Sequence, residues 1–132
     1  MIIGFTGTSK YSLTNKQIRE VRQLLKQCEE VHHGDCIGAD ASFHELAKAC
    51  GKRIVIHPPM KDNHRAYKVG DVVHPVKAYL QRNHNIVNAV DLMIACPHTD
   101  VEQLRSGTWA TIRYARKVGK ALEVLPRGEE NA

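Results

Sequence analysis

The sequence predicts an α/β fold, a Rossmann-like doubly wound and mainly parallel five-stranded sheet with helices on both faces. Two observations lead to it. Short apolar runs of strand length alternate with segments in which apolar residues recur at helical spacing. Glycine or proline closes most of these runs, and this alternation is typical of βαβ units and a parallel sheet. Right-handed crossovers then place helices on both sheet faces.

The first half of the chain is expected to contain strands at residues 2–6, 31–33 and 53–57. Between the first two, apolar residues recur at helical spacing from 13 to 28, and Thr14 with Gln17 fits a capping box at the helix start. Between the second and third, the helical pattern ends at Cys50, and Gly51 suits the position after a helix end. The three strands and two helices thus form two consecutive βαβ units.

Residues 58–78 are less regular, with Gly70 and Pro75 as breakers. A loop of this length in a small domain is usually functional or mobile. Beyond it, helices are expected at about 79–89 and 107–118, and strands at 91–96 and 121–125. The predicted order of elements is therefore βαβαβ, a long loop, and αβαβ.

Length and composition are those of one small globular domain. The chain has 132 residues, of which 42% are hydrophobic and 25% charged. We expect a single domain over residues 1–126 and a loose tail at 127–132. Apolar runs stay well short of the roughly 20 residues of a membrane span, and the N-terminus lacks the features of a signal peptide. A cytoplasmic protein with no membrane partner is expected.

Charge and aromatic content narrow the choice of partners. The net charge of +5 and a pI of about 9.1 favour anionic partners. Aromatic residues make up 5% of the chain, which is low for a protein that stacks many single-stranded bases. His32, His33, Cys36 and His44 match no strong zinc pattern. We therefore expect neither a bound metal nor a cofactor.

The most informative segment is the small-residue turn Ser106-Gly107-Thr108, which follows the apolar run 91–96 and a polar loop and leads into a helix. Backbone N–H groups of such a turn face a ligand, and the helix N-terminus carries partial positive charge. Hydroxyl groups of Ser106, Thr108 and Thr111 add donors. The segment predicts an anion site, and we expect the phosphate of a nucleotide to occupy it.

In an open α/β sheet, ligands bind beyond the carboxyl ends of the strands, where the strand order switches. Three other segments fall at or near such ends and are expected to converge with Ser106-Gly107-Thr108: Gly7-Thr8-Ser9, the turn from Gly34 to Asp40 with Asp35 and Gly38, and Arg82-Asn83. The first of these either binds phosphate or is a plain strand-to-helix turn. The chain lacks the Lys-Ser/Thr ending of a P-loop and a GxGxxG fingerprint, which disfavours an ATPase and a dinucleotide site.

Charged side chains at these ends have alternative roles. Asp35 and Asp40 could bind ribose hydroxyls or act as acid or base, and Asp40 could instead only cap a helix. A ligand role is favoured for Asp35, because it directly follows Gly34 at a strand end. Arg82 could hold a phosphate or carboxylate as a bidentate donor, with Asn83 beside it, or be a solvated helix charge.

In this order, the segments 33–40, 82–83, 91–97 and 106–108 resemble the SLOG superfamily. That superfamily includes the Lonely Guy phosphoribohydrolases and the Rossmann domain of DNA-processing protein A. The resemblance extends from Gly4 to Leu125. It implies a Rossmann-like domain that binds a nucleotide or nucleotide-derived small molecule. It also implies a homo-oligomer, since relatives often dimerise through helices.

The resemblance offers two alternatives to simple nucleotide binding. In Lonely Guy enzymes an Arg and a Glu after the glycine-rich turn help to cleave the N-glycosidic bond of a nucleoside monophosphate. Arg82 occupies the Arg position, but the Glu is missing here, so a hydrolase would need Asp35, Asp40 or Glu102 in its place. The turn at Ser106 is closer to that of DNA-processing protein A, which implies single-stranded nucleic acid as the other alternative.

Overall fold

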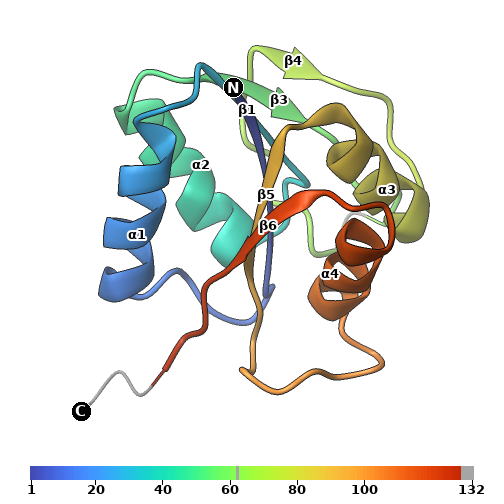
Figure 1. The fold of residues 1–132 in the computed structure, drawn as a ribbon. Coiled ribbons are helices and arrows are strands. Elements are labelled where there is room, and N and C mark those ends of the chain that lie inside the picture. The colour runs from blue at the N-terminus through green and yellow to red at the C-terminus, as the bar shows by residue number, and fades with distance from the viewer. Residues whose placement is uncertain (62, 129–132) are drawn as a thin grey trace.

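The computed structural model describes residues 1–61 and 63–128, and a parallel sheet forms its centre (Figure 1). The strands are β1 (Ile2–Gly7), β2 (Glu30–His33), β3 (Arg53–Ile56), β4 (Val72–Val73), β5 (Leu92–Cys96) and β6 (Ala121–Val124). They lie in the order β4-β3-β2-β1-β5-β6, and each neighbouring pair is parallel. The predicted doubly wound α/β fold is confirmed.

Within the described residues the sheet has six strands, so the prediction of five was wrong by one. The additional strand, β4, lies within the irregular segment 58–78 and pairs with the last two residues of β3. Two residues are too few to show a periodic pattern. The flanking Gly70 and Pro75 also read as breakers, which is why the sequence pattern did not reveal this edge strand.

In the part of the chain that the structure describes, four helices connect the strands: α1 (Asn15–Leu25), α2 (Ala39–Ala49), α3 (Tyr79–Ala89) and α4 (Gly107–Lys117). The predicted capping box starts α1: the backbone N–H of Gln17 donates to the Thr14 hydroxyl, and the backbone N–H of Thr14 donates to the Gln17 side chain, both at 3.0 Å. Among the helices of the described residues, none is long and apolar enough to cross a membrane.

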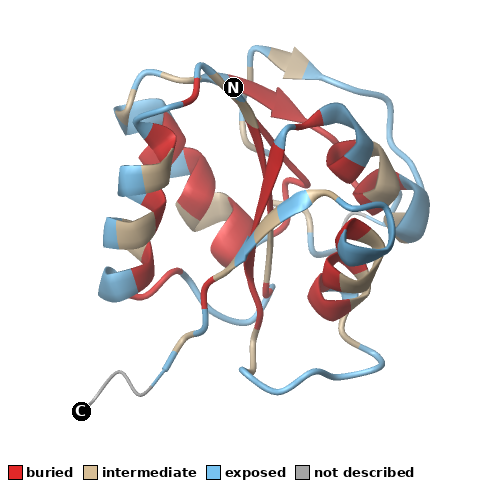
Figure 2. Ribbon diagram, in the orientation of Figure 1, coloured by how far each residue is buried: buried red, intermediate tan, exposed pale blue. Residues whose placement is uncertain are grey.

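Helices α1 and α2 cover one face of the sheet, and α3 and α4 cover the other (Figures 1 and 2). Alternate residues of β5 divide between these faces, because successive strand side chains point in opposite directions. Ile94 and Cys96 belong to the core beneath α1 and α2, whereas Met93 and Ala95 pack toward α3 and α4. Both faces are therefore buried, and β5 reads as a continuous apolar run.

The chain winds outward from β1 through β2 and β3 to β4, then crosses to β5 on the other side of β1. The strand order thus switches between β1 and β5, whose carboxyl ends meet at the pair Gly7 and Cys96. Helix α2 follows β2 and helix α4 follows β5, so both N-termini lie at this same edge of the sheet. A ligand site is expected there.

The segment predicted as a loose tail, 127–132, begins with an anchored residue. The backbone N–H of Arg127 donates to Asp100 Oδ1 at 3.1 Å, its Nη1 donates to the Ser12 carbonyl oxygen at 3.0 Å, and its guanidinium lies 4.4 Å from the ring centre of Tyr11. Residues 129–132 lie outside the described part of the chain.

Candidate functional site

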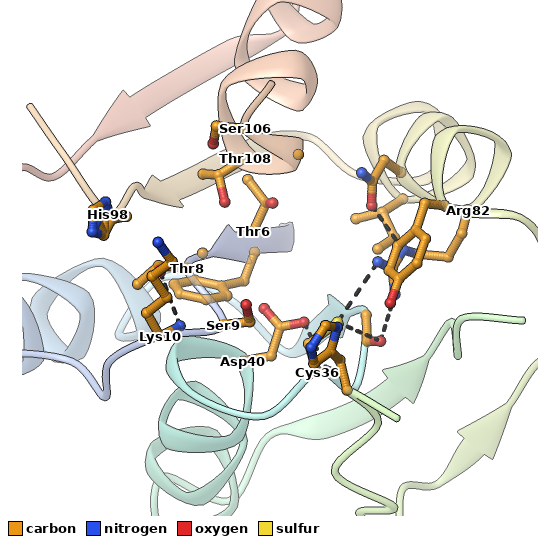
Figure 3. Close-up of a pocket in the computed structure, with 18 of the residues that line it drawn as sticks. Thr6, Thr8, Ser9, Lys10, Cys36, Asp40, Arg82, His98, Ser106 and Thr108 are labelled. Carbon is orange, nitrogen blue, oxygen red and sulfur yellow. Dashed lines mark hydrogen bonds between the residues drawn. The ribbon is translucent and has the colours of Figure 1, made fainter. Parts of the chain in front are cut away.

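A cavity of about 470 Å³ lies beyond the carboxyl ends of β1, β2 and β5 (Figure 3). All four segments singled out in the sequence contribute to it. Of the predicted site residues, the structure brings together Gly7, Thr8, Ser9, Gly34, Asp40, Arg82, Asn83, Ser106, Gly107 and Thr108. Asp35 and Gly38 are not among the residues that line it.

One end of the cavity is the N-terminus of α4. Ser106 is its N-cap, and its hydroxyl accepts the backbone N–H of Trp109 at 3.2 Å. Gly107 and Thr108 are the first two residues of the helix, so their N–H groups have no partner within it. The Thr111 hydroxyl, expected to face the ligand, donates instead to the Gly107 carbonyl oxygen at 2.9 Å. The backbone and Thr108 therefore form the donor set here.

The turn after β1 is fixed between β5 and α2. The Thr8 N–H donates to the Cys96 carbonyl oxygen at 3.0 Å, and the Thr8 carbonyl oxygen accepts the Ala39 N–H at 2.9 Å. Gly38 makes this approach possible. Its φ is +84°, and a Cβ there would lie 2.7 Å from the Thr8 carbonyl oxygen. The geometry thus supports a structural role for Gly38: it lets the turn after β1 pack closely against the start of α2, and it does not line the cavity.

Arg82 on α3 is buried, with 4% of its surface exposed. Its Nη1 donates to the carbonyl oxygens of Gly34 at 2.5 Å and His57 at 3.2 Å. Its Nε donates to Asn83 Oδ1 at 2.7 Å, and Nη2 lies 3.8 Å from Cys36 Sγ. A guanidinium carries five N–H groups, and these contacts use four. Arg82 therefore supplies positive charge to the wall and at most one donor to a ligand.

Asp35 is wholly buried and faces the segment 63–68. Its Oδ2 accepts Arg65 Nε at 3.0 Å, and its Oδ1 accepts the backbone N–H of Lys68 at 2.9 Å. These partners lie in the irregular stretch after β3, about 30 positions away, where no sequence pattern indicated them. Through these two contacts, Asp35 holds the segment 63–68 against the turn after β2.

Asp40 takes the position at the cavity wall that was favoured for Asp35. Gly38 is the N-cap of α2, so Asp40 lies inside the first turn and is not the cap. Its Oδ2 accepts the Cys36 N–H at 3.1 Å, whereas Oδ1 meets no hydrogen-bond partner within the described residues. Burial raises the pKa of Asp40 to about 6, although the nearby Arg82 guanidinium opposes the rise.

Cys36 lies beside Asp40 and Arg82 in the same wall. Burial raises the pKa of its thiol to about 11. A thiol with this pKa stays protonated at neutral pH, so the site does not supply a cysteine nucleophile.

Sequence reasoning missed several lining residues, among them Thr6, Lys10 and His98. Each lies at or within three residues of the carboxyl end of β1 or β5. The strand-end rule that selected Gly7 to Ser9 would have found all of them if applied more widely. Within the described residues, the lining includes the cations Lys10, Arg82 and Arg105 and one acidic side chain, Asp40. The cavity thus has a positive excess suited to an anion.

The histidines considered as zinc ligands bind one another or nearby groups. His33 Nδ1 accepts the Asp35 N–H at 2.9 Å, so Nε2 carries the proton and donates to His44 Nδ1 at 2.9 Å. His32 lies between Glu30 and His57, 2.8 Å from each. Across residues 1–61 and 63–128, no group of three or more His, Cys, Asp or Glu side chains is placed to hold a metal ion.

Comparison with known proteins finds likeness at the level of structure. No protein-family model and no curated protein sequence matches the chain. The molybdenum cofactor binding protein from the phototrophic bacterium Rippkaea orientalis is similar with a TM-score of 0.73 and 21% identity, over 95% of this chain and 76% of that one. The protein TM1055 is similar with a TM-score of 0.64 and 17% identity, over 92% of this chain and 71% of that one.

DNA processing protein A from Streptococcus pneumoniae is also similar, with a TM-score of 0.66 and 17% identity. That likeness covers 94% of this chain but 50% of the other, so the present chain spans half of that protein. Together the three likenesses show that the chain shares the fold of these proteins. One of them, DNA processing protein A, is a protein that the sequence resemblance pointed to.

Proposed function

We propose that the cavity binds the phosphate group of a nucleotide or nucleotide-derived small molecule. The observation that carries this proposal is the N-terminus of α4, where the N–H groups of Gly107 and Thr108 begin a helix at the cavity wall. Unpaired N–H groups and the positive end of the helix together favour an anion. The ordered turn at Thr8 brings further hydroxyl and backbone groups to the same cavity.

Charge and size support the same ligand class. Lys10 and Arg105 are exposed, and both line the cavity, so they can attract an anion from solution. The volume of about 470 Å³ lies within the range of roughly 300–1,000 Å³ typical of small-molecule sites. The similar protein from Rippkaea orientalis binds the molybdenum cofactor, so a protein with this fold accommodates a small-molecule ligand.

Incubation with a panel of ligands tests the proposal. The panel holds nucleoside 5′-monophosphates, their unphosphorylated nucleosides, cyclic nucleotides and nicotinamide dinucleotides, read by thermal shift and by mass spectrometry of the small molecules. We expect a monophosphate to raise the melting temperature while its nucleoside does not. Intact ligand indicates a binder, and release of free base indicates a glycosidase. If no phosphate-bearing compound shifts the melting temperature at low salt, the proposal is wrong.

A matched pair of variants locates the site. Arg105→Ala removes a cation from the cavity wall, and Arg116→Ala removes one from the last turn of α4, remote from the cavity. Both residues are exposed, so neither change should alter folding. Weaker nucleotide binding by the first variant alone supports the cavity as the site. Equal affinities in both would place the nucleotide elsewhere.

A further inference from the structure

One oxygen of the cavity wall lacks a partner. Asp40 Oδ1 has no hydrogen-bond donor among the described residues, although Asp40 is 96% buried, since only 4% of its surface is exposed. The other oxygen, Oδ2, is held by the Cys36 N–H at 3.1 Å. Figure 3 shows this carboxylate in the wall between Ser9 and Cys36. A buried acceptor left unpaired costs free energy, so a donor supplied from outside the chain gains more here than at an exposed carboxylate.

The neighbouring cation, Arg82, does not donate a hydrogen bond to Asp40 Oδ1. The Arg82 guanidinium directs its Nη1 and Nε donors to Gly34, His57 and Asn83. It lies close enough to stabilise the Asp40 charge, but no ion pair joins the two side chains within the described residues. Arg82 therefore leaves Asp40 Oδ1 open to a donor from the ligand.

The position of Asp40 relative to the anion site limits what that donor can be. Asp40 begins α2 after β2, and Gly107 begins α4 after β5, with β1 between these strands. Strand ends two places apart in a sheet are separated by about 10 Å. This exceeds the reach of a single phosphate group, so the donor belongs to another part of the same ligand. A second phosphate near Asp40 would be repelled by the carboxylate.

We infer that Asp40 orients the ligand by accepting a hydrogen bond from a neutral O–H or N–H group carried by the molecule whose phosphate occupies the α4 end. This inference rests on the proposed function. The donor is a ribose hydroxyl or an N–H of the base, since both present the same chemistry to a carboxylate. The site therefore selects ligands with an anion at one end and a neutral donor at the other, and disfavours those with anions at both ends.

Burial of the carboxylate fits this role. The raised pKa of Asp40 leaves the group ionised at neutral pH but incompletely stabilised, which strengthens its gain from a ligand donor. Arg82 on α3 and Asp35 in the turn after β2 are the charged groups that act on it, the first lowering and the second raising its pKa.

Asp40→Asn tests the inference, with inorganic phosphate, ribose 5-phosphate and the nucleoside 5′-monophosphates as probes in calorimetric titrations. The amide keeps an oxygen for the Cys36 N–H but removes the charge. We expect the variant to lose about tenfold to a hundredfold in affinity for the organic phosphates and to keep or improve its affinity for inorganic phosphate. Asp71→Asn is the matched control. The Asp71 carboxylate accepts the Ile54 N–H near the amino end of β3, whereas the cavity lies beyond the carboxyl ends of the strands.

The probes separate the two sources of the donor. If ribose 5-phosphate already shows the loss, and 2′-deoxyribose 5-phosphate binds the wild-type protein more weakly, the donor is a hydroxyl. If the loss appears only with nucleotides whose base has an N–H group, the donor is on the base. Both results support the inference. Equal losses for inorganic and organic phosphates, or no loss at all, overturn it.

A comparison on the wild-type protein keeps the inference testable should the variant fold poorly. Nucleotides that lack both ribose hydroxyls and carry a base methylated at its N–H positions are expected to bind about as weakly as inorganic phosphate. Binding as tight as that of the parent nucleotide would overturn the role of Asp40 and leave the phosphate site standing. If no phosphate compound binds the wild-type protein, both the proposed function and this inference fail.

Discussion

Arg82 Nη1 donates to the carbonyl oxygen of Gly34 at 2.5 Å, which ties helix α3 to the turn after β2 inside the cavity wall. The contact needs glycine at position 34, because a Cβ there would collide with the guanidinium. Arg82 thereby stabilises the site from within. In the proposed phosphate site, Arg82 would contribute the charge that it brings to the wall, since most of its donors serve the chain itself.

Arg82→Lys should destabilise the fold. An ammonium cannot reproduce the planar set of donors that reaches two carbonyl oxygens and Asn83 together. We expect the free energy of unfolding to fall by at least about 2 kcal/mol in urea denaturation. Arg53→Lys is the control, because Arg53 is exposed and pairs with Glu30 at the surface. Equal stability of the two variants would contradict the structural role of Arg82.

Gly38→Ala should disrupt the turn after β1, whereas Gly51→Ala should cost less. Both glycines have positive φ, +84° and +72°, so both variants bear backbone strain. Only at Gly38 would the added Cβ meet other atoms, at 2.7 Å from the Thr8 carbonyl oxygen. Melting temperatures and nucleotide affinity of the two variants give the comparison. Equal losses of stability in the two variants would show that the Thr8 carbonyl oxygen does not crowd a Cβ at position 38.

The sequence was informative where interactions are local. Thr14 and Gln17 are three positions apart, and their capping box formed as predicted. The pattern of short continuous apolar runs indicated the strands of the core, because strands buried on both faces are apolar at nearly every position. It gave no sign of β4, whose two residues pair only because β3 is already in place.

The segments that form the candidate site could be predicted from the sequence, but the contacts that its charged residues make could not. Topology places strand ends together, so Gly7, Ser106 and Arg82 were found from the order of elements alone. The partners of Asp35 lie 30 and 33 positions away in an irregular segment, and no periodicity encodes such contacts. That Asp40 and not Asp35 lines the cavity could be seen only in three dimensions.

Asp40→Asn should raise stability at neutral pH. The pKa of Asp40 is raised in the folded protein from 3.8 to about 6, so the folded state holds this proton more tightly than the unfolded state. Stability from this group is therefore highest below pH 4 and falls as pH rises through 6. The variant should gain on the order of 2–3 kcal/mol at pH 7.5 and nothing at pH 3.5. A pH-independent difference between variant and wild type would contradict the buried, ionisable state of Asp40.

His33→Asn should weaken the loss of stability in acid. Burial lowers the pKa of His33 from 6.5 to about 3, with His44, His57, Arg82 and His32 adding to the effect. Below pH 6.5, His33 of the unfolded chain binds a proton, whereas His33 of the folded protein stays neutral until the pH nears 3. The free energy of unfolding is therefore retained above pH 6.5 and falls as the pH falls below it. The Asn oxygen can still accept the Asp35 N–H.

Urea denaturation of both proteins at pH 7 and pH 5 measures the difference. The variant should lose about 1–2 kcal/mol less than the wild type between these pH values. Asp40 has the opposite pH dependence but is present in both proteins, so it cancels in the comparison. Parallel losses would show that His33 is not held neutral by burial.

The most direct test of the phosphate site is a titration of ¹⁵N-labelled protein with a nucleoside 5′-monophosphate, followed by amide NMR. We predict the largest saturable shifts at the backbone N–H groups of Gly107 and Thr108, with inorganic phosphate shifting the same amides at higher concentration. Shifts that leave these amides unchanged, or that cluster on another face of the sheet, would contradict the account.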